Sequence, residues 1–187
     1  VQQQLLDALL DTGTPVVLTL LTGRPYALGG APGRAAAVVH SFFPGEEGGP
    51  ALAGVLSGRI NPSGRLPVSV PASPGAQPGT YLSPPLGRLT EVSSIDPTPA
   101  YAFGHGLGYT SFEFSDLVLD GPAQVPVDRE TAVSLTVTNT GGRDGAEIVQ
   151  LYLHDPVASV VRPVQRLIGY ARVPLAAGAS ARVSVTV

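Results

Sequence analysis

Residues 42–71, FFPGEEGGPALAGVLSGRINPSGRLPVSVP, separate two parts of the chain that have different hydrophobic patterns. Within this segment Leu52, Val55 and Leu56 recur at the spacing of one helical face, which predicts a short helix. Gly58 is expected to end that helix, because glycine readily adopts the left-handed conformation of a C-cap. Before the segment the pattern is typical of an α/β fold, and well after it the pattern is all-β.

The first part, residues 1–71, is predicted to form a portion of an α/β sandwich. Residues 1–10 show a helical stripe of leucines at positions 5, 6, 9 and 10. Residues 15–21 and 34–43 are nearly continuous apolar runs, which is the pattern of strands buried on both faces of a parallel sheet. Ligands bind beyond the carboxyl ends of such strands, so the loops TGRP and FFPGEEGG are the places to look for a site.

The second part of the chain is predicted to be a connection followed by a β-sandwich. Residues 72–110 are mostly rich in proline, glycine and serine without a hydrophobic period, and a structureless segment of this length is typical of a linker or an interdomain loop. Residues 111–187 contain short alternating runs separated by turn sequences: TAVSLTVTN, AEIVQLYLHD, QRLIGYARV and ARVSVTV. This spacing favours an immunoglobulin-like or fibronectin type III-like sandwich, with a domain boundary near residue 111.

Missing residue types exclude several classes of chemistry. The chain has no cysteine, and all eleven of its basic residues are arginine. Disulfides, thiolate nucleophiles, P-loop lysines and Schiff-base lysines are therefore impossible. The three histidines, at positions 40, 105 and 154, are too far apart in sequence for metal-ligand spacing. We expect no metal and no cofactor.

The charge and the apolar content also narrow the possible partners. A net charge of −3 offers no basic surface for nucleic acid or for an anionic membrane, so neither is expected as a partner. The longest apolar stretch, residues 15–21, is far shorter than a transmembrane helix. The absence of cysteine gives the cytoplasm a slight preference over secretion as the compartment. The chain begins within a predicted helix and ends within an alternating strand pattern. It is therefore expected to be a fragment cut at both ends.

The order of the motifs resembles one enzyme family along the whole chain. VVLTLLTGRP is followed by PGEEGG, a helix, NPSGRLPVSVP, FGHGLGYTSFEF, VTNTGGRDGAEIVQLYLHDP and RPVQRLIGYARVPLAAG. This series resembles the C-terminal part of family 3 glycoside hydrolases, the β-glucosidases and β-xylosidases. NPSGRLP and FGHGLGYT in sequence before a fibronectin-like module are the most specific part of the resemblance.

The resemblance implies an architecture and a reaction. The family has a (β/α)8-type barrel, then an α/β sandwich, then a fibronectin type III-like domain, and this chain matches the end of the second part and most of the third. The family's nucleophile is an aspartate on the barrel, and its acid/base is usually a glutamate upstream in the sandwich. Neither segment has a match here, so we expect this chain to hold no catalytic residue and to be inactive alone. The parent would be a retaining, exo-acting β-glycosidase whose barrel binds a β-glycoside or oligosaccharide.

Two other functions fit the sequence less well. A non-catalytic carbohydrate-binding or scaffolding module is the alternative, but the chain has no tryptophan and only six tyrosines and five phenylalanines for stacking on sugars. An α/β hydrolase would need a G-x-S-x-G elbow, and Ser57 in GVLSG is off by one position.

Four residues are candidates for substrate binding: Arg24, Glu46, Glu47 and His105. Glu46 and Glu47 are adjacent, so their side chains diverge and cannot bracket one glycosidic bond. Their simpler role is to interact with the dipole of the following helix. His105 could line a sugar site or make backbone hydrogen bonds in a tight turn, and Arg24 could bind a sugar hydroxyl or form a structural ion pair.

Two further expectations concern packing. Arg162 and Arg166 are expected to cover apolar surface with their aliphatic stems, where the β domain packs on the sandwich. A sandwich without all its strands leaves apolar edges unpaired, so residues 1–70 are expected to be partly molten or to aggregate when the chain is produced alone.

Overall fold

The computed structural model describes residues 1–76, 79–126 and 128–187, which form two compact units. The first unit holds Val1–Leu56 and Leu66–His105, and the second holds Ser57–Arg65 and Gly106–Val187. This grouping differs from the expected ranges in two ways. Ser57–Arg65 belongs to the β-rich unit, and the expected connection 72–110 is divided, its part up to His105 lying in the first unit and its part from Gly106 in the second. Residues 77 and 78 of the expected linker, and residue 127 of the expected β domain, lie outside the described residues.

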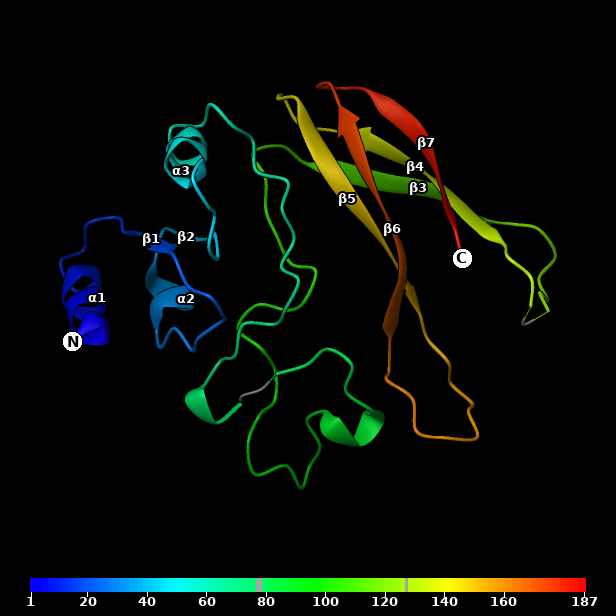
Figure 1. The fold of residues 1–187 in the computed structure, drawn as a ribbon, viewed down its shortest axis with the longest axis horizontal. Coiled ribbons are helices and arrows are strands. Elements are labelled where there is room, and N and C mark those ends of the chain that lie inside the picture. Colours follow the sequence, from blue (N-terminus) through cyan, green and yellow to red (C-terminus); the bar gives the residue numbers. More distant parts are fainter. Residues whose placement is uncertain (77–78, 127) are drawn as a thin grey trace. The chain divides into compact units, whose positions relative to one another are not determined.

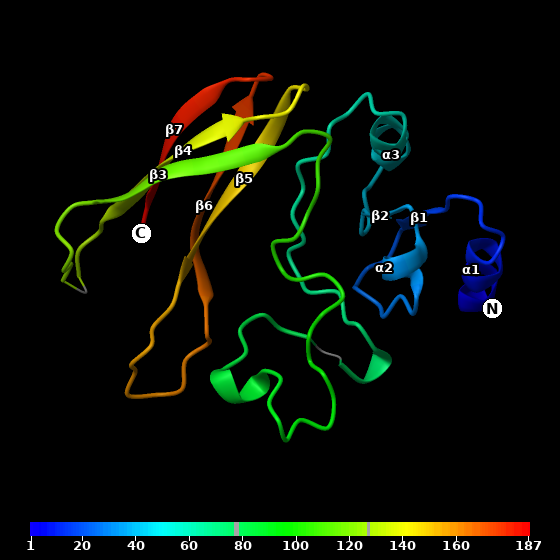
Figure 2. The same ribbon diagram turned by 180° about the vertical axis from the view of Figure 1, so that it is seen from behind.

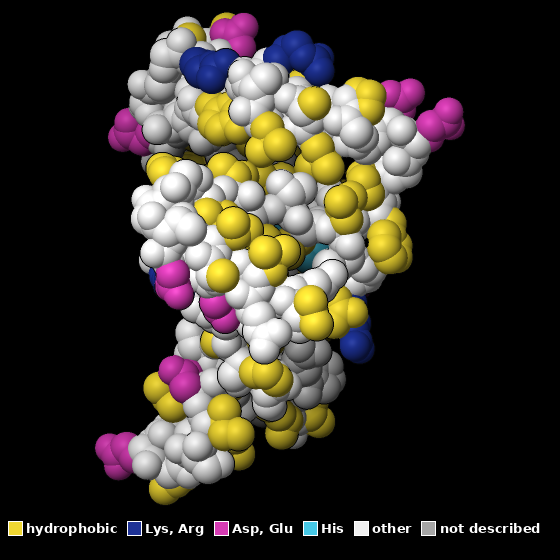
Figure 3. Space-filling view, turned by 90° about the vertical axis from the view of Figure 1, so that its left-hand side faces the viewer, with side chains coloured by type: hydrophobic (Ala, Val, Ile, Leu, Met, Phe, Trp, Pro, Cys, Tyr) yellow, Lys and Arg dark blue, Asp and Glu magenta, His cyan; other side chains and the backbone are white. Residues whose placement is uncertain are grey.

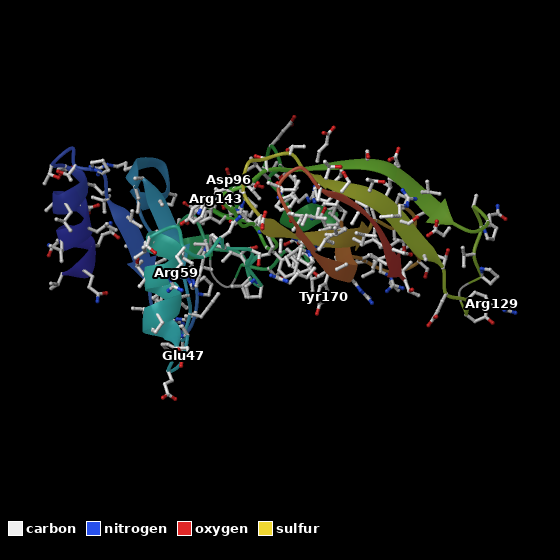
Figure 4. The ribbon with its side chains drawn as sticks, turned by 90° about the horizontal axis from the view of Figure 1, so that it is seen from above. Glu47, Arg59, Asp96, Arg129, Arg143 and Tyr170 are labelled. Carbon is white, nitrogen blue, oxygen red and sulfur yellow. The ribbon has the colours of Figure 1, made fainter. Side chains whose placement is uncertain are left out.

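The first unit has the predicted α/β order of elements. Strands β1 and β2 pair in parallel, with Val17 opposite Ala37 and Leu20 opposite His40. Figures 1 and 4 show the two strands between helices α1 and α3. The bounds of these elements are α1 Gln2–Leu10, β1 Val17–Leu20, α2 Ala31–Arg34, β2 Ala37–His40 and α3 Gly48–Leu56.

The core of this unit is smaller than the sequence predicted. Leu28, Ala31 and Val70 are buried, and Leu6 and Leu10 are among the partly buried side chains that pack against them. The composition of the two strands predicted burial on both faces, and this prediction is wrong. The residues of β1 and β2 are only half-buried or exposed. The physical reason is that each strand of a two-stranded sheet has one neighbour, so part of its surface stays open.

Helices α1 and α3 lie at their predicted positions, but only part of their predicted faces is buried. Helix α2 was not predicted, and its last residue, Arg34, had been expected in the second strand. The leucine stripe of α1 divides, because Leu5 is 62% exposed and Leu9 is 46% exposed. In α3 the buried residues are glycines, and Leu56 is exposed although it was expected on the buried face. Gly58 has a φ of +75°, which confirms the left-handed residue predicted to follow this helix.

Most of the expected connection, residues 72–105, belongs to the first unit and is mostly irregular, as predicted. Its described part contains only two 3₁₀ turns, η1 Pro74–Ala76 and η2 Pro85–Gly87. A backbone bridge between Val70 and Tyr101 joins the end of this segment to the chain just before its start, and the stacked rings of Tyr81 and Phe103, 3.9 Å apart, join two of its own parts.

The second unit is a β-sandwich, so the predicted fold class is confirmed. One antiparallel sheet has the strand order β3–β4–β7, and the other pairs β5 with β6. Figures 1 and 2 show the two sheets from opposite sides. The bounds are β3 Phe112–Asp120, β4 Ala132–Asn139, β5 Gly145–Leu153, β6 Arg166–Leu175 and β7 Ser180–Thr186. Alternating side chains of these strands form the core: Leu135, Val137, Val149, Val173 and Leu175.

Asn139 is the buried polar centre of the sandwich. Its side chain is inaccessible to solvent, and its Nδ2 donates to the carbonyl oxygens of Arg143 at 2.8 Å and Leu175 at 3.2 Å. Its Oδ1 accepts hydrogen bonds from Thr110 Oγ1 at 2.7 Å and from the Gly141 N–H at 3.1 Å. One amide therefore joins the end of β4, the following turn and the end of β6.

Much of the apolar surface remains exposed. Figure 3 shows hydrophobic side chains spread over one face of the molecule, with few charged ones among them. In the first unit Leu21 is 58% exposed and Phe43 is 78% exposed. The expected aggregation of residues 1–70 stays a prediction, and this surface is its physical basis. Within the part of the chain that the structure describes, no helix has the length and apolarity needed to cross a membrane.

We expect the substitution Asn139→Ala to lower the free energy of unfolding of the chain by about 2–4 kcal/mol, because it leaves several buried backbone and hydroxyl groups without a partner. Urea unfolding followed by far-ultraviolet circular dichroism measures this difference. Thr138→Ala is the matched control, since Thr138 is the half-buried neighbour on the same strand and its hydroxyl is hydrogen-bonded with Ser180 near the surface; it should cost about 1 kcal/mol or less. Equal losses for the two variants would contradict the central role of Asn139.

Candidate functional site

The loops at the carboxyl ends of β1 and β2 contain three of the four predicted site residues. Arg24 is exposed, and its guanidinium carbon lies 5.0 Å from the ring centre of Tyr26. This is a cation–π contact, which is favourable for arginine on an aromatic face. Among the described residues Arg24 forms no ion pair, so the structural ion pair suggested for it is not found. Its contact is with the ring of Tyr26 instead.

Glu46 and Glu47 are exposed and directly precede α3. Figure 4 shows the side chain of Glu47 extending away from the end of that helix. The Glu47 carbonyl accepts the Ala51 N–H at 3.0 Å, which places this residue at the helix start. Carboxylates at this position interact favourably with the helix dipole, as the simpler interpretation holds.

His105 lies in a tight loop of the first unit. Its N–H donates to the Ala102 carbonyl at 3.1 Å, and its own carbonyl accepts the Leu66 N–H at 2.8 Å. Its exposed ring stacks on Tyr101, with the ring centres 5.3 Å apart. Among the described residues, no hydrogen bond, ion pair or ring contact joins any two of the four predicted candidates.

His40 is a residue of this region that the sequence interpretation passed over. It ends β2, its Nε2 lies 3.3 Å from Thr22 Oγ1, and its ring centre is 4.1 Å from that of Phe42. Its Nδ1 is buried and has no hydrogen-bond partner among the described residues. Burial lowers the pKa of His40 below its ordinary value of 6.5, because charging the ring here would cost solvation. A histidine at the end of a predicted buried strand was the available signal.

We expect the free energy of unfolding to fall as the pH drops below about 6.5, because the unfolded chain binds a proton at His40 more readily than the folded chain does. The measurement is urea unfolding at several pH values between neutral and mildly acidic. His40→Gln should flatten this pH dependence, because it removes the ring that the unfolded chain protonates more readily than the folded chain. An unchanged slope in the His40 variant would refute the assignment.

A second cluster of functional side chains lies wholly within the β-rich unit. We call it the Arg65 junction: residues 61–65, 106–110 and 144–148. Its centre is an ion pair in which Arg65 Nη2 lies 2.6 Å from Glu147 Oε1, with the two side chains only 14% and 12% exposed. The same carboxylate oxygen accepts the Ile148 N–H at 2.7 Å, and Arg65 Nη1 donates to the Ser63 and Gly64 carbonyls. Both buried charges are therefore well paired.

Asn61 and Gly106 complete the Arg65 junction. Asn61 Nδ2 donates to the Asp144 carbonyl at 2.9 Å, and Asn61 Oδ1 accepts the Tyr109 N–H at 2.7 Å. A Cβ atom at Gly106 would lie 2.2 Å from the Gly64 carbonyl oxygen, so only glycine fits there. The motifs NPSGR, GHGLGY and GAEIV, which are far apart in sequence, thus meet at one place.

A half-open pocket of about 310 Å³ lies at the Arg65 junction, lined in part by Asn61, Arg65, Leu107 and Glu147. A general acid needs a carboxyl group free to exchange its proton with substrate. The Glu147 carboxylate is instead held by a guanidinium and a backbone N–H, so the junction is suited to structural support. Among the described residues no three histidine, aspartate or glutamate side chains gather as they would around a metal ion.

We expect Arg65→Met or Glu147→Leu alone to lower the free energy of unfolding by about 3–5 kcal/mol, because each leaves one buried charge unpaired. The double variant should be less destabilised than either single variant, since it removes both charges. Equilibrium unfolding of the three variants forms a double-mutant cycle. Simple additivity of the two losses would show that the ion pair is not a coupled unit.

The chain is similar to two known domain families and to several glycosidases. The Glycosyl hydrolase family 3 C-terminal domain matches residues 1–109, and a Fibronectin type III-like domain matches residues 147–187. A periplasmic β-glucosidase of Salmonella typhimurium is 41% identical over 193 residues, which cover 98% of this chain and 25% of that protein. A β-xylosidase of Formosa agariphila is 36% identical, covering 98% of this chain and 26% of that protein.

Solved structures give the same result. A β-glucosidase from Erythrobacter marinus matches 100% of this chain and 24% of its own chain, with a TM-score of 0.90 and 39% identity. A β-glucosidase from Listeria innocua, solved in complex with glucose, matches with a TM-score of 0.88 and 33% identity over 100% of this chain and 27% of its own. The chain thus spans about a quarter of the length of these relatives.

Proposed function

Because this chain belongs to glycosyl hydrolase family 3, as its motifs predicted, we propose that it is the non-catalytic C-terminal portion of a retaining, exo-acting β-glycosidase. The whole protein would remove terminal β-linked glucose or xylose from glycosides or oligosaccharides. The observation behind this proposal is the 41% identity to a β-glucosidase over 98% of the chain, combined with coverage of only 25% of that relative.

The carboxylates of this chain support the non-catalytic part of the proposal. A retaining glycosidase places two carboxyl groups about 5 Å apart across the scissile bond. Glu46 and Glu47 are adjacent and exposed, and Glu147 is occupied by Arg65. We therefore assign both catalytic carboxylates to the part of the protein that this chain does not span.

The role left for this chain is mechanical. A reaction that depends on two carboxyl groups at a set separation needs a rigid support, because small errors in position cost large factors in rate. The Arg65 junction and the Asn139 hydrogen bonds supply that rigidity within the β-rich unit. The double displacement uses only carboxyl groups and water, so the proposal includes no metal or cofactor.

We expect hydrolysis of p-nitrophenyl β-glucoside or β-xyloside by the intact protein and none by this chain alone. In the intact protein Glu46→Gln and Glu47→Gln should keep kcat within about threefold of wild type, whereas loss of a true catalytic carboxylate costs a factor of about 10² or more. Release of p-nitrophenol measures both. Turnover by the chain alone, abolished by either substitution, would overturn the assignment.

A further inference from the structure

The loops that follow β1 and β2 are joined to each other by side chains. His40, the last residue of β2, has its Nε2 3.3 Å from Thr22 Oγ1 in the loop after β1. The ring of Phe43 lies so close to Gly23 that a Cβ atom at that glycine would be 2.7 Å from Phe43 Cε2. The ring of Phe42 contacts that of His40. We call these three contacts the His40 clasp.

Little besides the clasp holds segment 42–46 in place. The Ser41 N–H and hydroxyl both donate to the Leu20 carbonyl, at 3.0 Å each, and the pairing of the two strands ends there. Among the described residues, the segment makes one backbone hydrogen bond beyond this point, from the Gly48 N–H to the Gly45 carbonyl at 3.2 Å, and that bond is local. Segments with so few backbone hydrogen bonds are those that open locally at low cost in free energy.

Phe42 adds backbone strain to this segment. Its φ is +53°, in the left-handed region that a bulky side chain occupies only when its surroundings impose it. One of these constraints is the packing of its ring on His40, with the ring centres 4.1 Å apart. Release of the segment frees the Phe42 backbone to return to an ordinary conformation, so strain favours opening once the contact with His40 is lost.

The closed clasp does not accommodate a proton on His40. Its Nδ1 is buried and has no hydrogen-bond partner in the part of the chain that the structure describes. An imidazolium donates from both ring nitrogens, so the charged ring leaves a buried Nδ1–H without an acceptor. Burial also lowers the pKa of His40 below its ordinary value of 6.5. In an opened segment, water solvates both nitrogens and the charge.

No neighbouring charge compensates this proton. Strand β1 and helix α3 contain no titratable side chain. The charged groups of α1, α2 and the two loops have other partners or are exposed: Asp7, Asp11, Arg24, Arg34, Glu46 and Glu47. Tyrosines stay neutral at acidic pH. Burial is the one cause of the lowered pKa of His40, so no charged group contributes to it.

We propose that His40 acts as an acid-sensitive latch: its neutral ring keeps segment 42–46 closed against Thr22 and Gly23, and protonation of the ring releases the segment. The proton comes from solvent, and no covalent bond other than N–H changes. Because the open form binds this proton more readily than the closed form, the open population grows as the pH falls below about 6.5. This inference is independent of the proposed function.

Native-state proteolysis of the intact protein measures the open population. A glutamate-specific endoprotease cleaves after Glu46 and Glu47 when the segment is released, and each rate is divided by that of a peptide with the sequence of residues 36–52 at the same pH. From about pH 7 to about pH 5.5 the normalised rate should rise about threefold or more, and by at most about tenfold per pH unit, because one proton is bound. His40→Gln should abolish the rise.

Two other glutamates of the same molecule provide controls, each normalised to its own peptide. Glu91 is exposed in the irregular part of the first unit, so its cleavage rate should not depend on pH. Glu147 is buried in β5, so it should stay uncut unless the β-rich unit unfolds. Thr22→Val removes the hydroxyl that contacts His40 and should raise cleavage of segment 42–46 at neutral pH.

A pH-independent rate in the wild-type protein would overturn the proposal, and so would a rise that persists in His40→Gln. A parallel rise after Glu147 would show unfolding of the chain instead of release of one segment, with the same consequence. If His40→Gln itself unfolds, Thr22→Val decides, and an unchanged rate at neutral pH then refutes the latch. Proteolysis needs no substrate, so an intact protein that hydrolyses neither glycoside would contradict the proposed function and leave this result unaffected.

Discussion

The ion pair between Arg65 and Glu147 determines how the β-rich unit is assembled. Both groups are almost removed from solvent, and a charge in such a place is tolerable only when its partner is present. Arg65 follows the helix α3 in the chain, and Glu147 lies in the strand β5, so the pair brings a segment from the first half of the sequence into the sandwich. Asn61 and Gly106 then fit around this pair, and the conformation of the whole junction follows from it.

The two units illustrate different ways of using apolar residues. In the sandwich, alternation places every second side chain between two sheets, and a compact core of valines and leucines results. In the α/β unit the parallel pair β1–β2 has a continuous apolar sequence but only a small core around Leu28, Ala31 and Val70. The same composition that favours a buried parallel strand thus leaves leucines exposed where neighbouring strands are not present.

Environment, and not residue type, separates the acidic residues of this chain. Glu46 and Glu47 are free in solvent at a helix start, where their charge is favourable. Glu147 is buried, and its lone pairs are used by a guanidinium and a backbone N–H. Neither environment resembles that of a nucleophile beside a general acid.

The family was recognised from the resemblance of its motif order, and helix α2 was not predicted. Local sequence patterns were sufficient to predict helices α1 and α3, strands β1, β2 and β4–β7, and the left-handed Gly58. These features depend on periodicity and turn chemistry over a few residues, and periodicity survives in any tertiary context. The buried Glu147 was visible in principle, because it shares the inward register of Val149 in AEIVQLYL. Its partner Arg65 was not, since no local rule pairs residues that are 82 positions apart.

Tertiary structure alone decided which side of each apolar element is buried, where the segment 57–65 belongs and which polar groups are desolvated. Burial is a property of the neighbours that surround a side chain, so the exposed half of the α1 leucine stripe could not be foreseen from its own spacing. The unpaired ring nitrogen of His40 and the four hydrogen bonds of Asn139 likewise exist only because distant segments meet there.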